Sequence, residues 1–208
     1  MPSKTQIITS NKNKDLARSV LEGLDYVFER HNEAIVIEDD ILSGENMLSF
    51  LNKSLDKYCN YDAVGSVSAY WFPINVPHKA TSQEAFFLKI ASSWAWGTWR
   101  KEWQKFRKGE DDYSSLKVQS IEREFDLDGS TNFSDLLKNQ LYKSKQISSW
   151  AILWRWHLFI NDKLTLFPYV SLAQNIGFDG TGRHCGSDEK LFVHESDICK
   201  SLVPNFPD

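Results

Sequence analysis

The pattern of apolar and polar positions predicts an alternation of helices and strands along most of the chain. Apolar residues that recur every three or four positions are typical of a helix with one buried face. This spacing occurs in residues 16–28, 47–58, 99–106, 134–141 and 150–160. Short apolar runs rich in β-branched or aromatic residues are typical of buried strands. Such runs occupy residues 34–37, 63–68, 85–90, 164–167 and 169–173.

The order of these segments predicts an α/β domain with a mostly parallel sheet. Near the start of the chain a helix, a strand, an acidic turn, a helix and a strand follow one another, which is typical of such sheets. Asn13, Thr98 and Ser134 stand where a side chain can cap three of the helices. Segments rich in proline, acidic residues or glycine predict loops at 70–77, at 109–131 (with one short helix) and at 175–185. We therefore expect a single domain over residues 1–208, with a weakly structured tail from residue 186.

The strand expected at residues 34–37 runs directly into three carboxylates, Glu38, Asp39 and Asp40. Three acids at one strand end repel one another at neutral pH, and a cation relieves that repulsion. Mg²⁺ and Mn²⁺ take oxygen ligands and commonly bridge to substrate phosphates. Ligands of open α/β sheets bind beyond the carboxyl ends of the strands. The pattern therefore fits a metal–diphosphate site, and it fits a solvated acidic turn equally well.

Composition narrows the class of protein and its location. The chain has 208 residues, enough for one domain with a sizeable core. Its net charge of -4 argues against a general nucleic-acid binder, which is normally basic. Its 3 cysteines are an odd number without metal-ligand spacing, which indicates thiols in a reducing compartment. No apolar run approaches the roughly 20 residues of a membrane-spanning helix, and the first residues lead into no signal-peptide core. We therefore expect a cytoplasmic protein without a transmembrane segment.

The 8 tryptophans require an explanation. Flat aromatic rings pack against the apolar C–H faces of sugars, which makes Trp94 and Trp96 candidates for sugar binding, although core packing explains them equally well. Trp99 and Trp103 lie in the helix predicted at residues 99–106. That helix also carries the basic residues Arg100, Lys101, Lys105, Arg107 and Lys108. Two interpretations of such a helix are open. It could bind a membrane surface or a phosphate-bearing acceptor, or, as is more common, its basic residues form a solvent-exposed helix face.

Four segments in this order resemble bacterial sugar transferases with the GT-A fold, of the family-2-like type. They are IVIEDDI, SSWAWGTW, SSWAILWRW and LFPYVSLAQNIGFDGTGRHC, and the resemblance extends over residues 16–185. More distantly, the chain is similar to the metal-dependent N-acetylglucosaminyltransferases of the Golgi. The resemblance implies that Glu38, Asp39 and Asp40 form a DXD-type motif, which holds Mn²⁺ or Mg²⁺ under the diphosphate of a nucleotide sugar. In that family the last acid binds the metal directly, and the two earlier acids face the ribose and the donor sugar.

The resemblance also implies roles for two further segments. Residues 92–99, which include Trp94 and Trp96, resemble the acceptor side, and residues 176–185 resemble a mobile loop over the substrate. Three glycines let that loop adopt conformations that other residues avoid, and Gly180 would contact the donor. His184 would add a metal or phosphate contact. The implied function is a hexosyltransferase that moves a sugar from a nucleotide-sugar donor to a glycan or another hydroxyl acceptor, in bacterial polysaccharide synthesis, in the cytoplasm or peripherally at the inner membrane.

The sequence departs from the family pattern at two points. An inverting transferase needs a general base, yet Ala151 and Ile152 occupy the place where the Golgi enzymes carry a carboxylate, which leaves Asp179 as the fallback. The family also has βαβ units ahead of the acidic motif, whereas here only a helix and a loop precede it. We therefore expect the C-terminal part of a GT-A domain, whose strand at residues 34–37 lies at an exposed sheet edge that favours self-association or a borrowed segment.

Two other classes of protein share some of these features. A non-catalytic carbohydrate-binding module would explain the abundance of tryptophan, the missing base and the short segment ahead of the acidic motif. A metal-dependent phosphohydrolase uses similar acids, but it needs more carboxylate or histidine ligands than the sequence offers.

Overall fold

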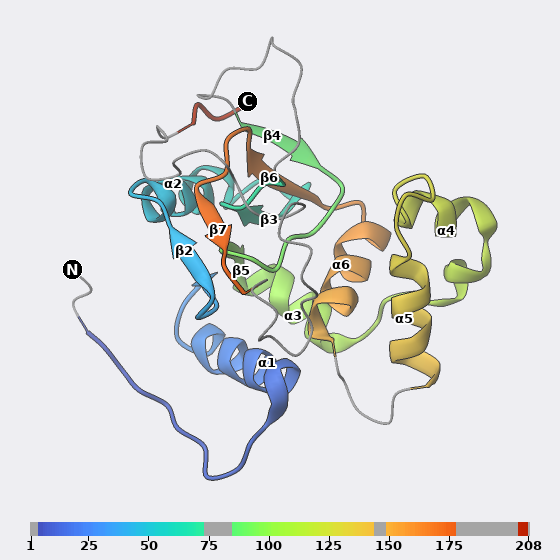
Figure 1. Ribbon diagram of the computed structural model, residues 1–208, viewed down its shortest axis with the longest axis horizontal. Coiled ribbons are helices and arrows are strands. Elements are labelled where there is room, and N and C mark those ends of the chain that lie inside the picture. Colours follow the sequence, from blue (N-terminus) through green and yellow to red (C-terminus); the bar gives the residue numbers. More distant parts are fainter. Residues whose placement is uncertain (1–3, 73–84, 144–148, 178–203, 208) are drawn as a thin grey trace.

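The structure is a computed structural model that describes residues 4–72, 85–143, 149–177 and 204–207 (Figure 1). Its helices are α1 (Asp15–Phe28), α2 (Met47–Tyr58), α3 (Arg100–Lys108), α4 (Gln119–Phe125), α5 (Phe133–Tyr142) and α6 (Trp150–Ile160), with a 3-10 helix η1 (Ser114–Lys117). Its strands are β1 (Glu33–Val36), β2 (Ile41–Ser43), β3 (Val64–Ser68), β4 (Ala85–Leu88), β5 (Trp96–Trp99), β6 (Leu164–Pro168) and β7 (Ala173–Asn175). The predicted mixture of helices and strands is thus confirmed.

The main sheet has the strand order β1-β5-β3-β6-β4, and it is mostly antiparallel. Only β3 and β6 form a parallel pair, while β1–β5, β3–β5 and β4–β6 are antiparallel. The predicted mostly parallel sheet is therefore wrong. The reason is β5, which was expected to open a helix: it inserts between β1 and β3 and runs in the opposite direction. Because β5 is antiparallel to both neighbours, β1, β3 and β6 still point the same way, and their carboxyl ends lie at one end of the sheet.

The first strand, β1, lies at the edge of the sheet rather than in its centre. Among the described residues it pairs with β5 alone. Its residues are half-buried or exposed, and Ile37, which follows it, keeps 44% of its surface exposed. The prediction of a strand buried on both faces is therefore wrong, whereas its expected place at an edge of the sheet holds among the described residues.

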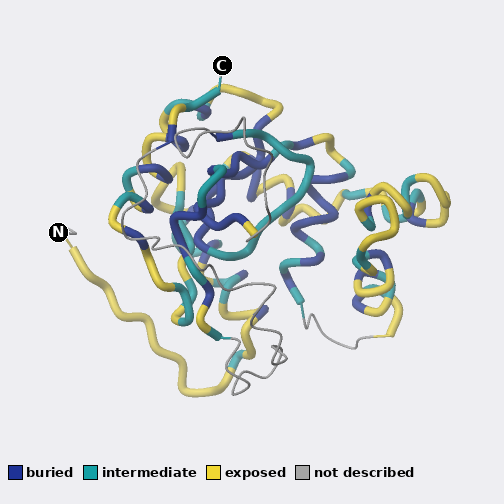
Figure 2. The backbone as a smooth tube through the Cα atoms, turned by 45° about the horizontal axis from the view of Figure 1, so that its top comes forward, coloured by how far each residue is buried: buried dark blue, intermediate teal, exposed yellow. Residues whose placement is uncertain are grey.

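Helices cover both faces of the sheet, so the core has two layers (Figure 2). On one face α2 packs against β3 and β5 through Phe50, Leu51, Leu55 and Tyr58. On the other face α1, α3 and α6 enclose a group of aromatic rings that includes Trp96, Trp103, Trp150 and Trp154. Every tryptophan of the chain except Trp94 is buried. Core packing therefore explains most of the tryptophan content.

A third, smaller cluster holds η1, α4 and α5 against α6. It is formed by Leu116, Phe125, Leu137, Ile152, Trp156 and Phe159. Residues 109–131, expected to be loop with one short helix, thus contain two helical segments, η1 and α4. Each has a single buried side chain, Leu116 or Phe125, which is too little for a helical period to appear in the sequence.

None of the three predicted caps forms. The N-cap position of α1 is Lys14, and Asn13, one residue earlier, accepts a hydrogen bond from the backbone N–H of Asp15 over 2.9 Å. Thr98 lies inside β5, where its hydroxyl donates to the carbonyl of Gly65. Ser134 lies in the first turn of α5, and its backbone N–H donates to the carboxylate of Asp126 instead. The cap of α5 is therefore a distant aspartate.

The segments after β6 and at the end of the chain differ from the expected pattern. The strand predicted at residues 169–173 is displaced to β7, because Pro168 ends β6 and an irregular turn follows. In the tail, Phe206 stacks on Phe50 and the carbonyl of Pro207 accepts a hydrogen bond from Lys57. Residues 204–207 are thus anchored to α2, while the loop predicted at 70–77 lies mostly outside the described residues.

Candidate functional site

Four chain segments meet at the carboxyl ends of β1, β3 and β6. Backbone hydrogen bonds of 2.8–2.9 Å join them: Ala69 N–H to Ala95 O, Leu172 N–H to Ala69 O, Gly44 N–H to Leu172 O, and Ile176 N–H to Asp40 O. This end of the sheet therefore holds the acidic triplet, the residues after β3, the residues before β5 and the start of the predicted glycine-rich loop. An open α/β sheet binds ligands at this end.

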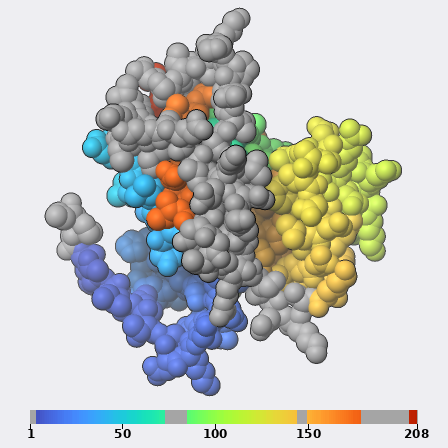
Figure 3. Space-filling model, in the orientation of Figure 1, coloured from blue at the N-terminus to red at the C-terminus, as the bar shows by residue number. Residues whose placement is uncertain are grey.

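The two-stranded ribbon of β2 and β7 fixes the acidic turn in place. Ile41 pairs with Asn175 in antiparallel register, directly after Asp40. The backbone N–H of Ile41 also donates to the carbonyl of Glu38, over 3.2 Å, which closes the turn around the triplet. Figure 3 shows β2 (light blue) and β7 (orange) side by side at the surface. The sequence did not predict β2, since three residues are too few for a recognisable period.

Residues 175–177, at the end of β7 and directly after it, contact both the backbone and the side chain of Asp40. Its carbonyl accepts the N–H of Ile176, its side chain is hydrogen-bonded by Asn175, and a Cβ added at Gly177 would lie 2.5 Å from Asp40 Oδ2. Its other carboxylate oxygen, Oδ1, is buried and has no hydrogen-bond partner among the described residues. Burial, reinforced by the charge of Asp39, raises the pKa of Asp40. An unpartnered buried carboxylate oxygen is costly unless a cation or another donor reaches it.

The pKa of Glu38 is strongly raised. Burial, followed by the charges of Asp40 and Asp39, raises its pKa from 4.5 to about 7. Asp39 is exposed to solvent. The triplet therefore carries the mutual repulsion that its sequence predicts, and a cation bound there would remove it.

The donor set fits a hard divalent cation with few protein ligands. Among the described residues, no three His, Cys, Asp or Glu side chains gather closely enough to enclose a metal ion. The orphaned oxygen of Asp40, with other oxygen donors beside it, suits Mg²⁺ or Mn²⁺, which retain several waters and take ligands from substrate phosphates. It does not suit Zn²⁺ in a closed site, which requires four nitrogen or sulfur ligands.

The two candidate tryptophans have different environments. Trp96 is fully buried, with its ring 5.4 Å from those of Trp150 and Trp154, so no face of it reaches a ligand. Its assignment as a sugar-binding residue is corrected to the core. Trp94 is half-buried before β5, and its ring contacts that of Tyr70 edge to face at 4.7 Å. Trp94 alone among the tryptophans combines a place at this end of the sheet with an accessible ring.

The structure places none of the other predicted site residues beside the acidic triplet. Asp179, Gly180 and His184, with most of the loop at residues 176–185, lie outside the described residues. Ala151 and Ile152 are in the first turn of α6, and Ile152 is buried in the third core cluster. The position of the family's base is thus apolar in the structure as well as in the sequence.

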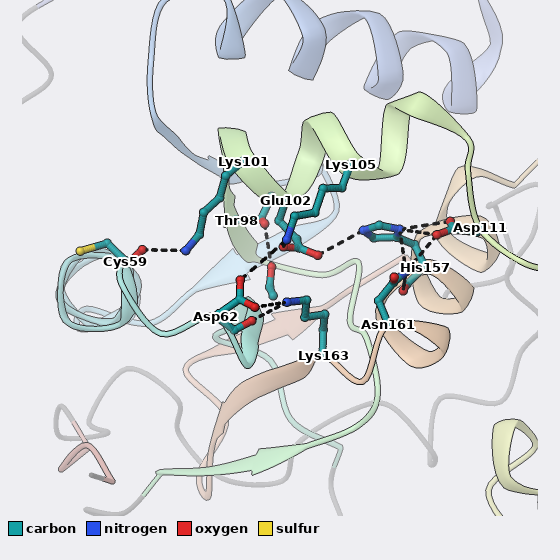
Figure 4. Close-up of polar contacts among 11 residues, drawn as sticks. Cys59, Asp62, Thr98, Lys101, Glu102, Lys105, Asp111, His157, Asn161 and Lys163 are labelled. Atoms are coloured by element: carbon teal, nitrogen blue, oxygen red, sulfur yellow. Dashed lines mark hydrogen bonds and ion pairs between the residues drawn. The ribbon is translucent and has the colours of Figure 1, made fainter.

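A second polar cluster lies on α3 and α6 (Figure 4). His157 is 2% exposed and binds Asp111 through Nδ1, over 2.9 Å, and Glu102 through Nε2, over 3.2 Å. Burial alone would lower the pKa of His157, but the hydrogen bonds and charges of these two carboxylates outweigh it and raise that pKa. Burial would likewise raise the pKa of Glu102, but the hydrogen bond with His157, with the charges of Lys163 and Lys105, lowers it.

This cluster is a structural ion network, remote from the acidic triplet. Asp62 and Lys163, which pair with each other, come just before β3 and β6, and Glu102 follows β5. These positions lie at the opposite end of the sheet from Asp40. Since the side chains of Glu102 and His157 are at most 2% exposed, neither is accessible to a substrate.

Sequence reasoning missed the residues that position Asp40 and the ion pairs of the structural network. Asn175 and Gly177, which position Asp40, stand at the start of the predicted glycine-rich loop, but nothing in the sequence connects them to a turn more than 130 residues earlier. The Glu102–His157 contact joins two helices whose sequences carry no motif. Both are long-range contacts, which local patterns do not encode.

The basic face of α3 is used within the protein. Arg107 forms a bidentate ion pair with Asp25, and Trp103 donates its indole N–H to the same carboxylate. Lys101 donates to the carbonyl of Cys59. Because Trp103 is buried in the core, the helix presents no aromatic face to a membrane.

Comparisons with known proteins leave the family open. No family model matches the chain, and no curated protein matches its sequence. Within the described parts of the chain, no helix has the length and apolarity needed to cross a membrane.

Proposed function

We propose that this chain is a metal-dependent glycosyltransferase domain, or the C-terminal part of a GT-A domain, that moves a sugar from a nucleotide-sugar donor to a glycan or another hydroxyl acceptor. The observation that carries the proposal is Asp40. Its carboxylate sits at the carboxyl end of the sheet, one of its oxygens is buried without a hydrogen-bond partner among the described residues, and residues 175–177 fix its position. This is the place and the chemistry that a divalent cation under a diphosphate requires.

Each residue of the triplet has its own role in this proposal. Asp40 holds Mn²⁺ or Mg²⁺, while Glu38 and the exposed Asp39 accept hydrogen bonds from hydroxyl groups of the ribose and the donor sugar. When bound, the metal supplies Lewis-acid stabilisation of the diphosphate leaving group. The accessible ring of Trp94 packs against a sugar ring on the acceptor side.

The open outer edge of β1 supports the version in which the chain is part of a larger domain. In the GT-A family, βαβ units ahead of the acidic motif cradle the nucleotide base. In this structure, none of the described residues pairs with that edge. We propose that nucleotide binding by these residues alone is weak, and that the protein works in the cytoplasm or at the inner face of a bacterial membrane.

The test is calorimetric titration of UDP, with and without Mn²⁺, on the longest chain that contains this domain. The proposal predicts nucleotide binding that requires the metal and is abolished by a chelator. No metal-dependent nucleotide binding would exclude it.

A carbohydrate-binding module is the second candidate. It is favoured by the accessible ring of Trp94 and by the apolar residues Ala151 and Ile152 where the family carries a carboxylate. Glycan binding that is indifferent to both UDP and chelator, and that is lost in Trp94→Ala, would support this alternative.

A further inference from the structure

Among the described residues, no strand pairs with the outer edge of β1, which leaves backbone groups there for another strand. The backbone N–H of Arg100 donates to the carbonyl of Asn32 over 2.7 Å, which fixes the phase of the β1–β5 ladder. Because alternate residues of an antiparallel strand bond to opposite sides, Ala34 bonds toward β5, whereas Glu33 and Ile35 point their backbone groups to the open side. Unpaired edge groups of this kind are a template for pairing with a further strand.

A hollow of about 630 Å³ lies beside this edge. It is lined by residues of β1 and the turn before it, by residues of α2, and by Trp99 of β5. Its walls combine apolar groups, among them Ile35 and Leu55, with the acidic side chains of Glu33 and Asp56. The hollow therefore suits an apolar side chain on a strand that carries positive charge.

The chain itself contains a segment with these properties. Residues 4–13 form an extended, exposed arm ahead of α1 (Figures 1 and 2), in which Gln6 accepts a hydrogen bond from the hydroxyl of Tyr26 over 3.0 Å. Ile7 and Ile8 are 84% and 63% exposed, although both are strongly apolar and favour strands. The arm contains Lys4 and Lys12 and no acidic residue.

The two isoleucines match the two faces of the sheet. Adjacent residues of a strand point to opposite faces. At β1, Ile35 packs into the core on the α2 face, and Ala34 packs on the α1 face. A strand laid along β1 with Ile7 and Ile8 level with these residues would place one isoleucine in the hollow beside α2 and the other beside α1.

We propose that residues 5–9 of one copy of this chain add as a strand to the outer edge of β1 in a second copy. If the exchange is reciprocal, the product is a closed dimer with two equivalent strand pairings. The exchange covers the exposed edge of the strand that leads to Glu38, and it removes two isoleucines from water. It does not depend on glycosyl transfer, but it competes for this edge with the βαβ units that the proposed larger domain would supply.

The experiment is light scattering over a wide range of concentrations, paired with hydrogen exchange at the amide of Ile35. We expect the apparent mass to double with concentration, and the exchange of that amide to slow in parallel. Ile7→Asp and Ile8→Asp should each keep the mass of a monomer, because both place a charge in the apolar contacts. Leu136→Asp is the matched control: Leu136 is 49% exposed on α5, which does not line the hollow, and the variant should leave the dimer intact.

Three results would overturn the proposal. The first is a monomer mass at every concentration. The second is a dimer that persists in both arm variants, which would place the interface elsewhere. The third is slow exchange at Ile35 that does not depend on concentration, which would show that the edge is covered within the chain. Circular dichroism of the arm variants checks that loss of the dimer does not reflect unfolding, and Ile7 and Ile8 have little contact to lose.

Discussion

Replacing Glu38 with glutamine should stabilise the metal-free protein at neutral and alkaline pH. The folded protein raises the pKa of Glu38 from 4.5 to about 7, through burial first and through the charges of Asp40 and Asp39 second. Below pH 4.5 this side chain is protonated in both the folded and the unfolded chain, so it has no effect on stability. Between these two pKa values only the unfolded chain is ionised, and folding stability falls as pH rises. Above pH 7 the side chain is ionised in both states, and its full destabilisation of the folded protein is present.

The size of the penalty follows from the two pKa values. Each tenfold difference in proton affinity between the folded and unfolded states contributes about 1.4 kcal/mol, so the rise at Glu38 corresponds to an upper bound of about 3 kcal/mol. Glutamine has the same shape and no charge. We therefore expect the unfolding free energy of Glu38→Gln to equal that of the wild type at about pH 4. At about pH 8 it should be higher than that of the wild type by about 1–3 kcal/mol.

Urea denaturation in the presence of a chelator, repeated across this pH range, measures the difference. The control is Glu33→Gln, which neutralises an exposed carboxylate on β1, the strand that precedes Glu38, and should change stability by less than about 0.5 kcal/mol at every pH. A gain in Glu38→Gln that is the same at acid and alkaline pH would refute the reasoning, since it would owe nothing to ionisation. A gain of equal size in the control would refute it as well.

Three further predictions concern the site and the core. Gly177→Ala places a methyl group 2.5 Å from Asp40 Oδ2, so we expect at least tenfold weaker Mn²⁺ binding by calorimetry with little loss of stability by urea denaturation. Trp94→Ala should weaken glycan binding in a fluorescence titration while costing about 1–2 kcal/mol of stability, whereas Trp96→Ala in the core should cost about 3–5 kcal/mol. His157→Gln should cost about 3–5 kcal/mol, since it leaves two carboxylates without a cation. The folded protein raises the pKa of His157, so the protonated imidazole stabilises the folded state. Urea denaturation should show the full stabilisation by His157 below pH 6.5, and a loss of it as the pH rises through the pKa of the folded state.

The helices were predictable because each buries a regular stripe of side chains. Residues 47–58 and 150–160 coincide with α2 and α6, since several apolar anchors recur in each. The strands were less predictable. β5 has four residues, and its tryptophans fit a helix beginning as well as a strand. Its insertion between β1 and β3 is a long-range pairing, and that single error turned an antiparallel sheet into an expected parallel one.

The acidic triplet was visible in the sequence, but its electrostatics were not. Three adjacent acids after an apolar run indicated repulsion, and Glu38 shows it. The unpartnered oxygen of Asp40 depends on Asn175 and Gly177, which reach it through the β2–β7 pairing. The different environments of Trp94 and Trp96 were not visible in the sequence either, because they depend on Trp96 lying inside β5 and Trp94 before it.

The most direct test of the central claim is thermal unfolding of the wild type and of Asp40→Asn, each with and without Mn²⁺. A ligand present at about 100 times its Kd stabilises the folded state by about 2.7 kcal/mol, which raises the Tm of a domain of this size by roughly 5–10 °C. We predict such a rise in the wild type and none in Asp40→Asn, because the amide retains the shape of the carboxylate and loses its charge. An equal rise in both proteins would show that the metal binds elsewhere, and no rise in the wild type would contradict a metal site at the end of β1.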